Sequence, residues 1–132
     1  MIRCICILTM ALVGPLLLFG CGGGDAEEPE IFYGYSFPDP IITNFDTESG
    51  KGYLSMSIVL QVGSDQEIND YGSKAPRLKH AVVTFLAKKE TQEILPDLVQ
   101  DPIKMGEYIQ EAIKEEVGVE PKKVMFESFI RQ

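Results

Sequence analysis

LSMSIVLQV, residues 54–62, is the clearest strand in the sequence, with apolar side chains at every even-numbered position. Ser55, Ser57 and Gln61 stand between them, and this period of two predicts a β-strand with one buried face. Upstream, residues 41–45 read IITNF, a short run of β-branched and aromatic residues typical of a second strand. Between the two strands, residues 46–52 include Asp, Ser and two Gly residues, which favour turns, so the sequence predicts a β-hairpin.

Two helices follow the hairpin. The first is expected to begin near Ser73, with Pro76 in its first turn, and to end after Lys88 and Lys89. Its apolar side chains fall at helical spacing and predict one buried stripe, namely Ala75, Leu78, Ala81, Val82, Phe85 and Leu86. The second is predicted from Asp101 and Pro102 to Gly118, which suits a left-handed stop. We expect residues 63–72 to be mainly irregular, with at most a helical turn around Glu67 to Asp70, and residues 90–100 to form a connection with at most one turn of helix.

The chain closes on a third predicted strand, residues 124–130, whose sequence VMFESFI is apolar on much of both faces. That pattern favours a central position in the sheet. The expected domain is thus a small single α+β domain over residues 37–132. Its element order is β-β-α-α-β and its sheet is antiparallel or mixed.

The first twenty residues read as an export signal. Arg3 precedes an uncharged apolar run, and Leu18-Phe19-Gly20-Cys21 resembles the lipobox of bacterial lipoproteins. That resemblance implies cleavage after Gly20 and a lipid on the Cys21 thiol. It also explains a lone cysteine in an exported protein, since Cys4 and Cys6 would be removed with the signal peptide. The alternative is a retained transmembrane helix, because the uncharged run reaches Gly24. In both cases the domain lies outside the cytoplasm.

Residues 21–36 are predicted to be a lipid-anchored flexible tether. Three glycines precede an acidic stretch that cannot bury enough apolar surface to offset the entropy of ordering. Tyr33, Tyr35 and Phe37 end this segment, and we expect Phe37 to pack as the domain begins, with the tyrosines at its rim.

Composition and motifs argue against nucleic-acid binding and catalysis. The formal net charge of the 132 residues is −8, and a negative field repels phosphate backbones. The single histidine, His80, has no partners with which to form a catalytic or metal site. Phosphate-binding, nucleophile-elbow and zinc-protease motifs do not occur in the sequence. We therefore predict no catalytic residues, metal ligands or cofactor.

Four stretches resemble one known family, the flagellar basal body-associated protein FliL. Residues 35–45 look like the family's proline-flanked opening, and residues 52–60 are similar to its second strand. Residues 75–78 begin a helix as the family's do. Residues 124–132 look like its terminal strand, which commonly closes on Gln. The likeness covers roughly residues 35–132.

The resemblance implies a fold related to stomatin/prohibitin-like domains and a role in motility and chemotaxis. It implies contacts with flagellar stator and basal body proteins, and a homo-oligomer. Typical members keep an inner-membrane helix, whereas this chain carries the lipobox-like sequence. A lipid anchor is compatible with either the inner or the outer membrane. The alternative function is a periplasmic or cell-surface lipoprotein scaffold or binding module unrelated to motility.

Overall fold

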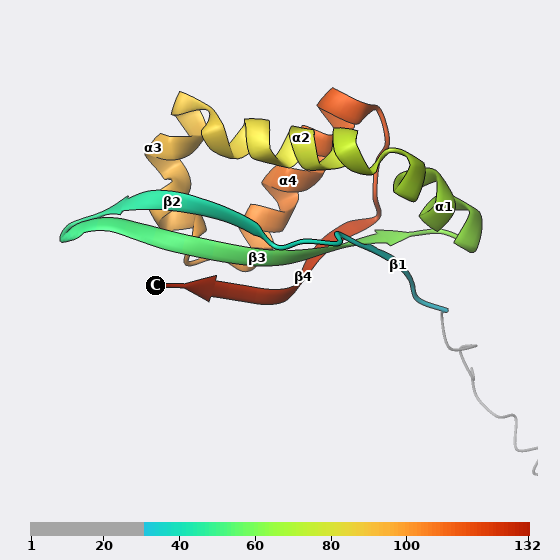
Figure 1. The fold of residues 1–132 in the computed structure, drawn as a ribbon, viewed down its shortest axis with the longest axis horizontal. Coiled ribbons are helices and arrows are strands. Elements are labelled where there is room, and N and C mark those ends of the chain that lie inside the picture. Colours follow the sequence, from blue (N-terminus) through green and yellow to red (C-terminus); the bar gives the residue numbers. More distant parts are fainter. Residues whose placement is uncertain (1–30) are drawn as a thin grey trace, which may run out of the picture. The chain divides into compact units, whose positions relative to one another are not determined.

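Strand β3, Gly50–Val62, is the longest strand and runs through the middle of the sheet. The computed structural model describes residues 31–132, which form an antiparallel four-stranded sheet and a layer of helices on one side of it (Figure 1). The large side chains of β3 that face the helices are buried, as the alternation predicted: Leu54, Met56, Ile58, Leu60 and Val62.

Three strands pair with β3. β1, Tyr33–Ser36, and β2, Ile41–Thr47, lie against its C-terminal and N-terminal parts, respectively. β4, Lys123–Arg131, pairs with Leu54–Gln61 and so overlaps both of those parts. Because a strand has only two edges, β1 and β2 must share one edge of β3, and β4 occupies the other.

The hairpin of β2 and β3 confirms the expected one, but the folded domain begins earlier than residue 37. Residues 33–36, placed by the sequence analysis at the end of the tether, form β1 and pair in register from Tyr33 with Val62 to Ser36 with Val59. The tyrosines of β1 and Phe37 pack against the core as partly buried side chains. Residues 1–30, which hold the predicted signal peptide and most of the predicted tether, lie outside the described residues.

Helices α2, Ala75–Ala87, and α4, Pro102–Val117, confirm the two predicted helices. The Asp101 carboxylate accepts a hydrogen bond from the Lys104 N–H at 3.1 Å and caps α4, as expected. Gly118 ends α4 with φ +81°, a left-handed conformation that glycine adopts without strain. The α2 start differs from expectation, because the Ser73 hydroxyl donates to the Asp70 carbonyl instead of capping α2.

Two further helices replace the expected irregular segments. In α1, Asp65–Ser73, the Ser64 hydroxyl accepts from the Glu67 N–H at 3.3 Å, and the Glu67 carboxylate accepts from the Gly63 N–H at 2.8 Å. In α3, Lys89–Leu98, a buried stripe of Thr91, Leu95 and Leu98 faces the core, although Pro96 lies inside the helix. The element order is therefore β-β-β-α-α-α-α-β, and the class is α+β, as predicted.

β4 is an edge strand and contains a bulge, so its predicted central position is wrong. Ser57 pairs with Ser128 and Ile58 with Phe126, which leaves Glu127 without a partner on β3. The extra residue shifts by one position the alternation of side chains between the two faces of the sheet. Phe126 and Phe129, three positions apart, thus face the helices together, opposite Ile58 and Met56.

The core lies between the inner face of the sheet and helices α2, α3 and α4, with Tyr71 of α1 joining it. The helices leave the other face of the sheet uncovered (Figure 1). Ile42, Tyr53 and Ile130 are exposed there, around the smaller Ser55, Ser57 and Ser128.

Candidate functional site

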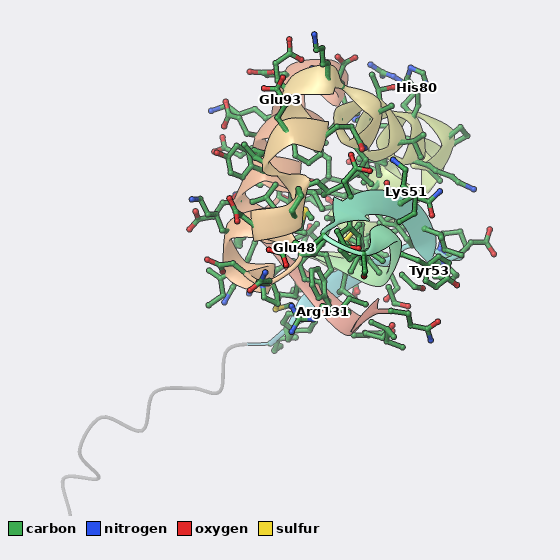
Figure 2. All side chains as sticks on the ribbon, turned by 90° about the vertical axis from the view of Figure 1, so that its left-hand side faces the viewer. Glu48, Lys51, Tyr53, His80, Glu93 and Arg131 are labelled. Atoms are coloured by element: carbon green, nitrogen blue, oxygen red, sulfur yellow. The ribbon has the colours of Figure 1, made fainter. Side chains whose placement is uncertain are left out.

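Of the two residues singled out from the sequence, His80 lies in the described part of the chain and Cys21 does not. Cys21, the predicted lipidation site, lies outside residues 31–132. His80 is exposed on α2, and its Nε2 atom lies 3.4 Å from the Thr84 hydroxyl. Figure 2 shows His80 and Glu93 pointing away from each other on opposite sides of the helical layer.

Two absences hold for residues 31–132. No three His, Cys, Asp or Glu side chains within that range gather closely enough to hold a metal ion. None of the helices in that range combines the length and the apolar character needed to cross a membrane.

An apolar groove with a volume of about 500 Å³ lies between α4 and β4. We call it the α4–β4 groove. Its lining includes Pro102, Ile103, Gly106, Glu107, Gln110, Lys123, Val124, Met125, Phe126 and Phe129. Ile103 is 75% exposed at its rim. An exposed apolar groove with a polar rim is typical of a docking surface.

The β4 bulge builds the aromatic wall of this groove. The Phe126 and Phe129 rings meet edge to face, with centroids 5.0 Å apart and planes at 63°. In a regular strand their odd spacing would put them on opposite faces of the sheet. The bulge at Glu127 therefore brings both rings to the same face of β4, where they line one side of the groove.

Two close contacts hold α4 beside β4. A Cβ atom on Gly106 would lie 2.9 Å from the Val124 carbonyl oxygen, so only glycine permits this approach. One turn further along α4, the Gln110 amide donates to the Pro121 carbonyl at 2.6 Å and fixes the segment leading into β4. The groove is therefore shaped before any partner binds.

A second surface, lined by both polar and apolar residues, lies at the other edge of the sheet, between α2 and β2; we call it the α2–β2 surface. Val83, 45% exposed, projects from α2, and Ile42, 55% exposed, lies on β2 with its side chain on the uncovered face of the sheet. They border a smaller hollow of about 290 Å³ that Leu86, Ala87 and other residues also line. The outer edge of β2 has no strand partner within residues 31–132.

Charge is unevenly distributed along the sequence of the helical segments. Residues 74–89 contain five basic side chains and no acidic one: Lys74, Arg77, Lys79, Lys88 and Lys89. Residues 90–120 contain nine acidic and two basic side chains. The ion pairs seen among residues 31–132 are Lys51 with Asp46, and Lys114 with Glu120 at 3.8 Å. None of the five basic side chains of residues 74–89 thus takes part in these ion pairs.

The aromatic residues near the start of the domain form a packed cluster. The Tyr35 ring lies 5.9 Å from that of Phe37 and 6.2 Å from that of Tyr71. Burial raises the pKa of both tyrosines, and the Glu67 and Glu120 carboxylates raise that of Tyr71 further. This cluster is structural, which agrees with the expectation that Phe37 packs where the domain begins.

The sequence analysis missed the α4–β4 groove and the α2–β2 surface. The signal for the groove was present, since two phenylalanines three residues apart in a strand require a bulge to share one face. For the α2–β2 surface, the sequence signal was residues 74–89, which contain five basic residues and no acidic one. The apolar Val83 lies within this range.

Comparison with known proteins supplies the identity. No curated protein matches the chain. The family model described as "Flagellar basal body-associated protein FliL" matches residues 34–132, which is most of the chain and nearly all of the described domain. The match begins within β1 and ends at the last residue of the sequence. The chain therefore belongs to the FliL family of flagellar basal body-associated proteins.

Proposed function

We propose that this protein supports the flagellar motor and motility through protein-protein contacts, without catalysing a reaction. Membership of the FliL family implies an accessory role at the basal body and an association with the membrane. The single observation that carries the finer proposal is the exposed apolar α4–β4 groove at one edge of the two-layer domain. Surfaces of this kind serve docking.

The anchor completes the proposal. Cys21 carries the lipid, the domain lies outside the cytoplasm, and residues 22–32 connect the two. A flexible segment of about ten residues has a root-mean-square span of roughly 16–19 Å. That reach keeps the domain close to the membrane that holds its partners, which we take to be stator and basal body proteins and further copies of this chain.

A deletion tests the proposal. Removing the coding sequence for residues 37–132 should reduce swimming, most strongly in viscous medium, where the motor works under load, while flagellar filaments remain visible by electron microscopy. The wild-type chain and the His80→Ala variant should restore swimming equally, because His80 is exposed and no metal-holding group of His, Cys, Asp or Glu side chains forms within residues 31–132. Normal swimming of the deletion strain in viscous medium would contradict the motor role.

The lipobox favours one alternative, a lipoprotein scaffold of the periplasm or cell surface without a role in motility. It would predict wild-type swimming together with a change in the envelope, such as altered sensitivity to detergent. Loss of swimming from the His80→Ala variant in a folded protein would contradict the non-enzymatic premise of both proposals.

A further inference from the structure

The exposed side of α2 carries a stripe of mainly apolar residues. Four exposed residues share it, at successive helical spacings of four, three and four positions: Pro76, His80, Val83 and Ala87. They lie opposite buried positions of the helix such as Leu78 and Phe85. Figure 2 shows His80 on the opposite side of the helical layer from Glu93 of α3. We call this stripe, with the basic residues around it, the α2 outer face.

Basic side chains surround the stripe. Arg77 comes one position after a residue of the stripe and Lys79 one position before another, so they lie about 100° to either side of it. The other three basic residues lie at the two ends of the helix: Lys74, Lys88 and Lys89. The long stems of lysine and arginine let the charged ends turn toward the plane of the stripe. The α2 outer face therefore presents an apolar centre within a ring of cations.

We propose that the α2 outer face lies on the surface of a membrane that contains anionic phospholipids. The cations attract the lipid phosphates, and apolar side chains between them enter the interfacial region of the bilayer. Val83, which is 45% exposed, is placed to do so. Five basic and no acidic side chains within residues 74–89 of a chain with a formal net charge of −8 select an anionic partner.

Charge also sets the orientation of the domain. Residues 90–120, with nine acidic and two basic side chains, are repelled by an anionic surface. The five cations of residues 74–89 take part in none of the ion pairs within residues 31–132, so they remain available to lipid phosphates. The domain therefore settles with α2 toward the membrane and with the Glu93 side of the helical layer away from it.

The tether permits this orientation. Tyr35 of β1 lines a hollow of about 290 Å³ together with Pro76 and Lys79, so the chain enters the domain beside the first turns of α2. Fully extended, residues 22–32 span at most about 36–40 Å. This length is about three times the diameter of a helix with its side chains, about 10–12 Å. An anchor at Cys21, for which the inference rests on the proposed function, therefore reaches a membrane on which α2 lies.

A fluorescent probe on α2 tests this contact in the full chain. The Val83→Cys variant, in a background of Cys4→Ser and Cys6→Ser, is purified from membranes, labelled with an NBD maleimide and reconstituted into vesicles. The anchor holds the chain on every vesicle, so the probe reports where α2 lies. On equal parts of phosphatidylcholine and phosphatidylglycerol, NBD emission should shift to shorter wavelength and be quenched by nitroxide-labelled lipids. On phosphatidylcholine alone, the probe should stay in water.

Two controls show where the probe reports from. The same background without Val83→Cys measures any label on Cys21. A probe on Glu93→Cys, on the opposite side of the helical layer, should show neither the shift nor the quenching on anionic vesicles.

Charge reversal tests the role of the cations. Arg77→Glu/Lys79→Glu should return the Val83 probe to water, and because both positions are exposed, the circular dichroism of the chain should not change. Lys104→Glu/Lys122→Glu makes the same change in net charge at two other exposed lysines and should leave most of the shift in place. Salt at about 1 M, where the Debye length is about 3 Å, should also reverse the shift.

The outcomes separate the alternatives. Equal emission on the two kinds of vesicle, or equal loss of the shift from the two charge-reversed pairs, would overturn the proposal. A Val83 probe that is shielded in cell membranes but exposed on anionic vesicles would assign the α2 outer face to an acidic protein, which also overturns it. The test measures fluorescence and not swimming, so failure of the lipid contact and failure of the motor role give different results.

Discussion

Gly106 of α4 lies directly against the backbone of Val124 in β4: a methyl group on Gly106 would sit 2.9 Å from the Val124 carbonyl oxygen. The contact joins the helical layer to the edge strand beside the α4–β4 groove. A backbone carbonyl in a paired strand cannot move aside cheaply, so this spacing is a strict requirement on the sequence.

Gly106→Ala should therefore destabilise the domain, although alanine favours helices. Overpacking costs about 1–3 kcal/mol, more than the gain of about 0.5–1 kcal/mol from replacing glycine in a helix. The matched control is Gly72→Ala in α1, where a Cβ atom meets nothing within 4 Å. Urea unfolding of residues 31–132 should show a loss for the first variant and a small gain for the second. Equal gains would contradict the close contact.

Ile58→Ala and Ile130→Ala compare the two faces of the sheet with identical chemistry. Ile58 is 1% exposed beneath the helices, whereas Ile130 is 51% exposed on the uncovered face. The first change should lower the free energy of unfolding by about 2–5 kcal/mol, and the second by about 0.5 kcal/mol. Losses of the same size, measured by urea unfolding, would mean that the uncovered face is buried in solution.

Tyr71 should make the domain sensitive to alkali. Burial, with smaller effects from Glu67 and Glu120, raises its pKa in the folded state, whereas in the unfolded chain it loses its proton near pH 10. The folded state then binds more protons, so this contribution is complete below about pH 10 and is lost as pH rises through the folded pKa.

Unfolding measured between pH 8 and pH 11.5 should show a steeper loss of stability for the wild-type domain than for Tyr71→Phe. Glu120→Gln should lessen the effect only slightly, because burial is the larger cause. Parallel curves for the wild type and Tyr71→Phe would show that the Tyr71 hydroxyl is solvated in the folded protein.

Cys21→Ser should prevent attachment of lipid and removal of the leader, measured by incorporation of labelled fatty acid and by the size of the chain on a gel. Acyl chains contribute about 0.8 kcal/mol for each buried CH₂ group, so their loss should alter how the chain is held at the membrane. Cys6→Ser, inside the predicted signal peptide, is the control and should be labelled normally. Normal labelling of both variants would contradict the lipoprotein proposal.

The sequence predicted those elements whose apolar periodicity is regular. β3 alternates without interruption from Leu54, and α4 has both of its end signals, Asp101 and Gly118. α1 was missed because the segment is too polar to show an apolar stripe at helical spacing. Ser64 and Glu67 nevertheless form a capping box, which is a sequence signal for the start of a helix.

The remaining differences come from tertiary packing. Pro96 reads as a helix breaker, but the buried stripe of α3 stabilises the helix around it. The edge position of β4 could not be read from its apolar sequence, because the α4–β4 groove exposes the apolar side chains that a central strand would bury. The groove itself depends on the pairing of β4 with β3, which strand periodicity alone does not reveal.

The bulge at Glu127 also determines which substitutions β4 can tolerate. Val124 and Phe126 face the helices before the bulge, and Phe129 does so after it, so the requirement for apolar residues changes from even to odd positions within one strand. A survey of all single substitutions should show this change of phase. Deletion of Glu127 alone should remove the bulge and leave Phe126 and Phe129 on the helix side and Ile130 on the uncovered face, because their pairing with β3 keeps its register. Comparisons of this chain with its relatives should therefore allow a one-residue gap at Glu127, because an ungapped alignment would equate side chains that lie on opposite faces.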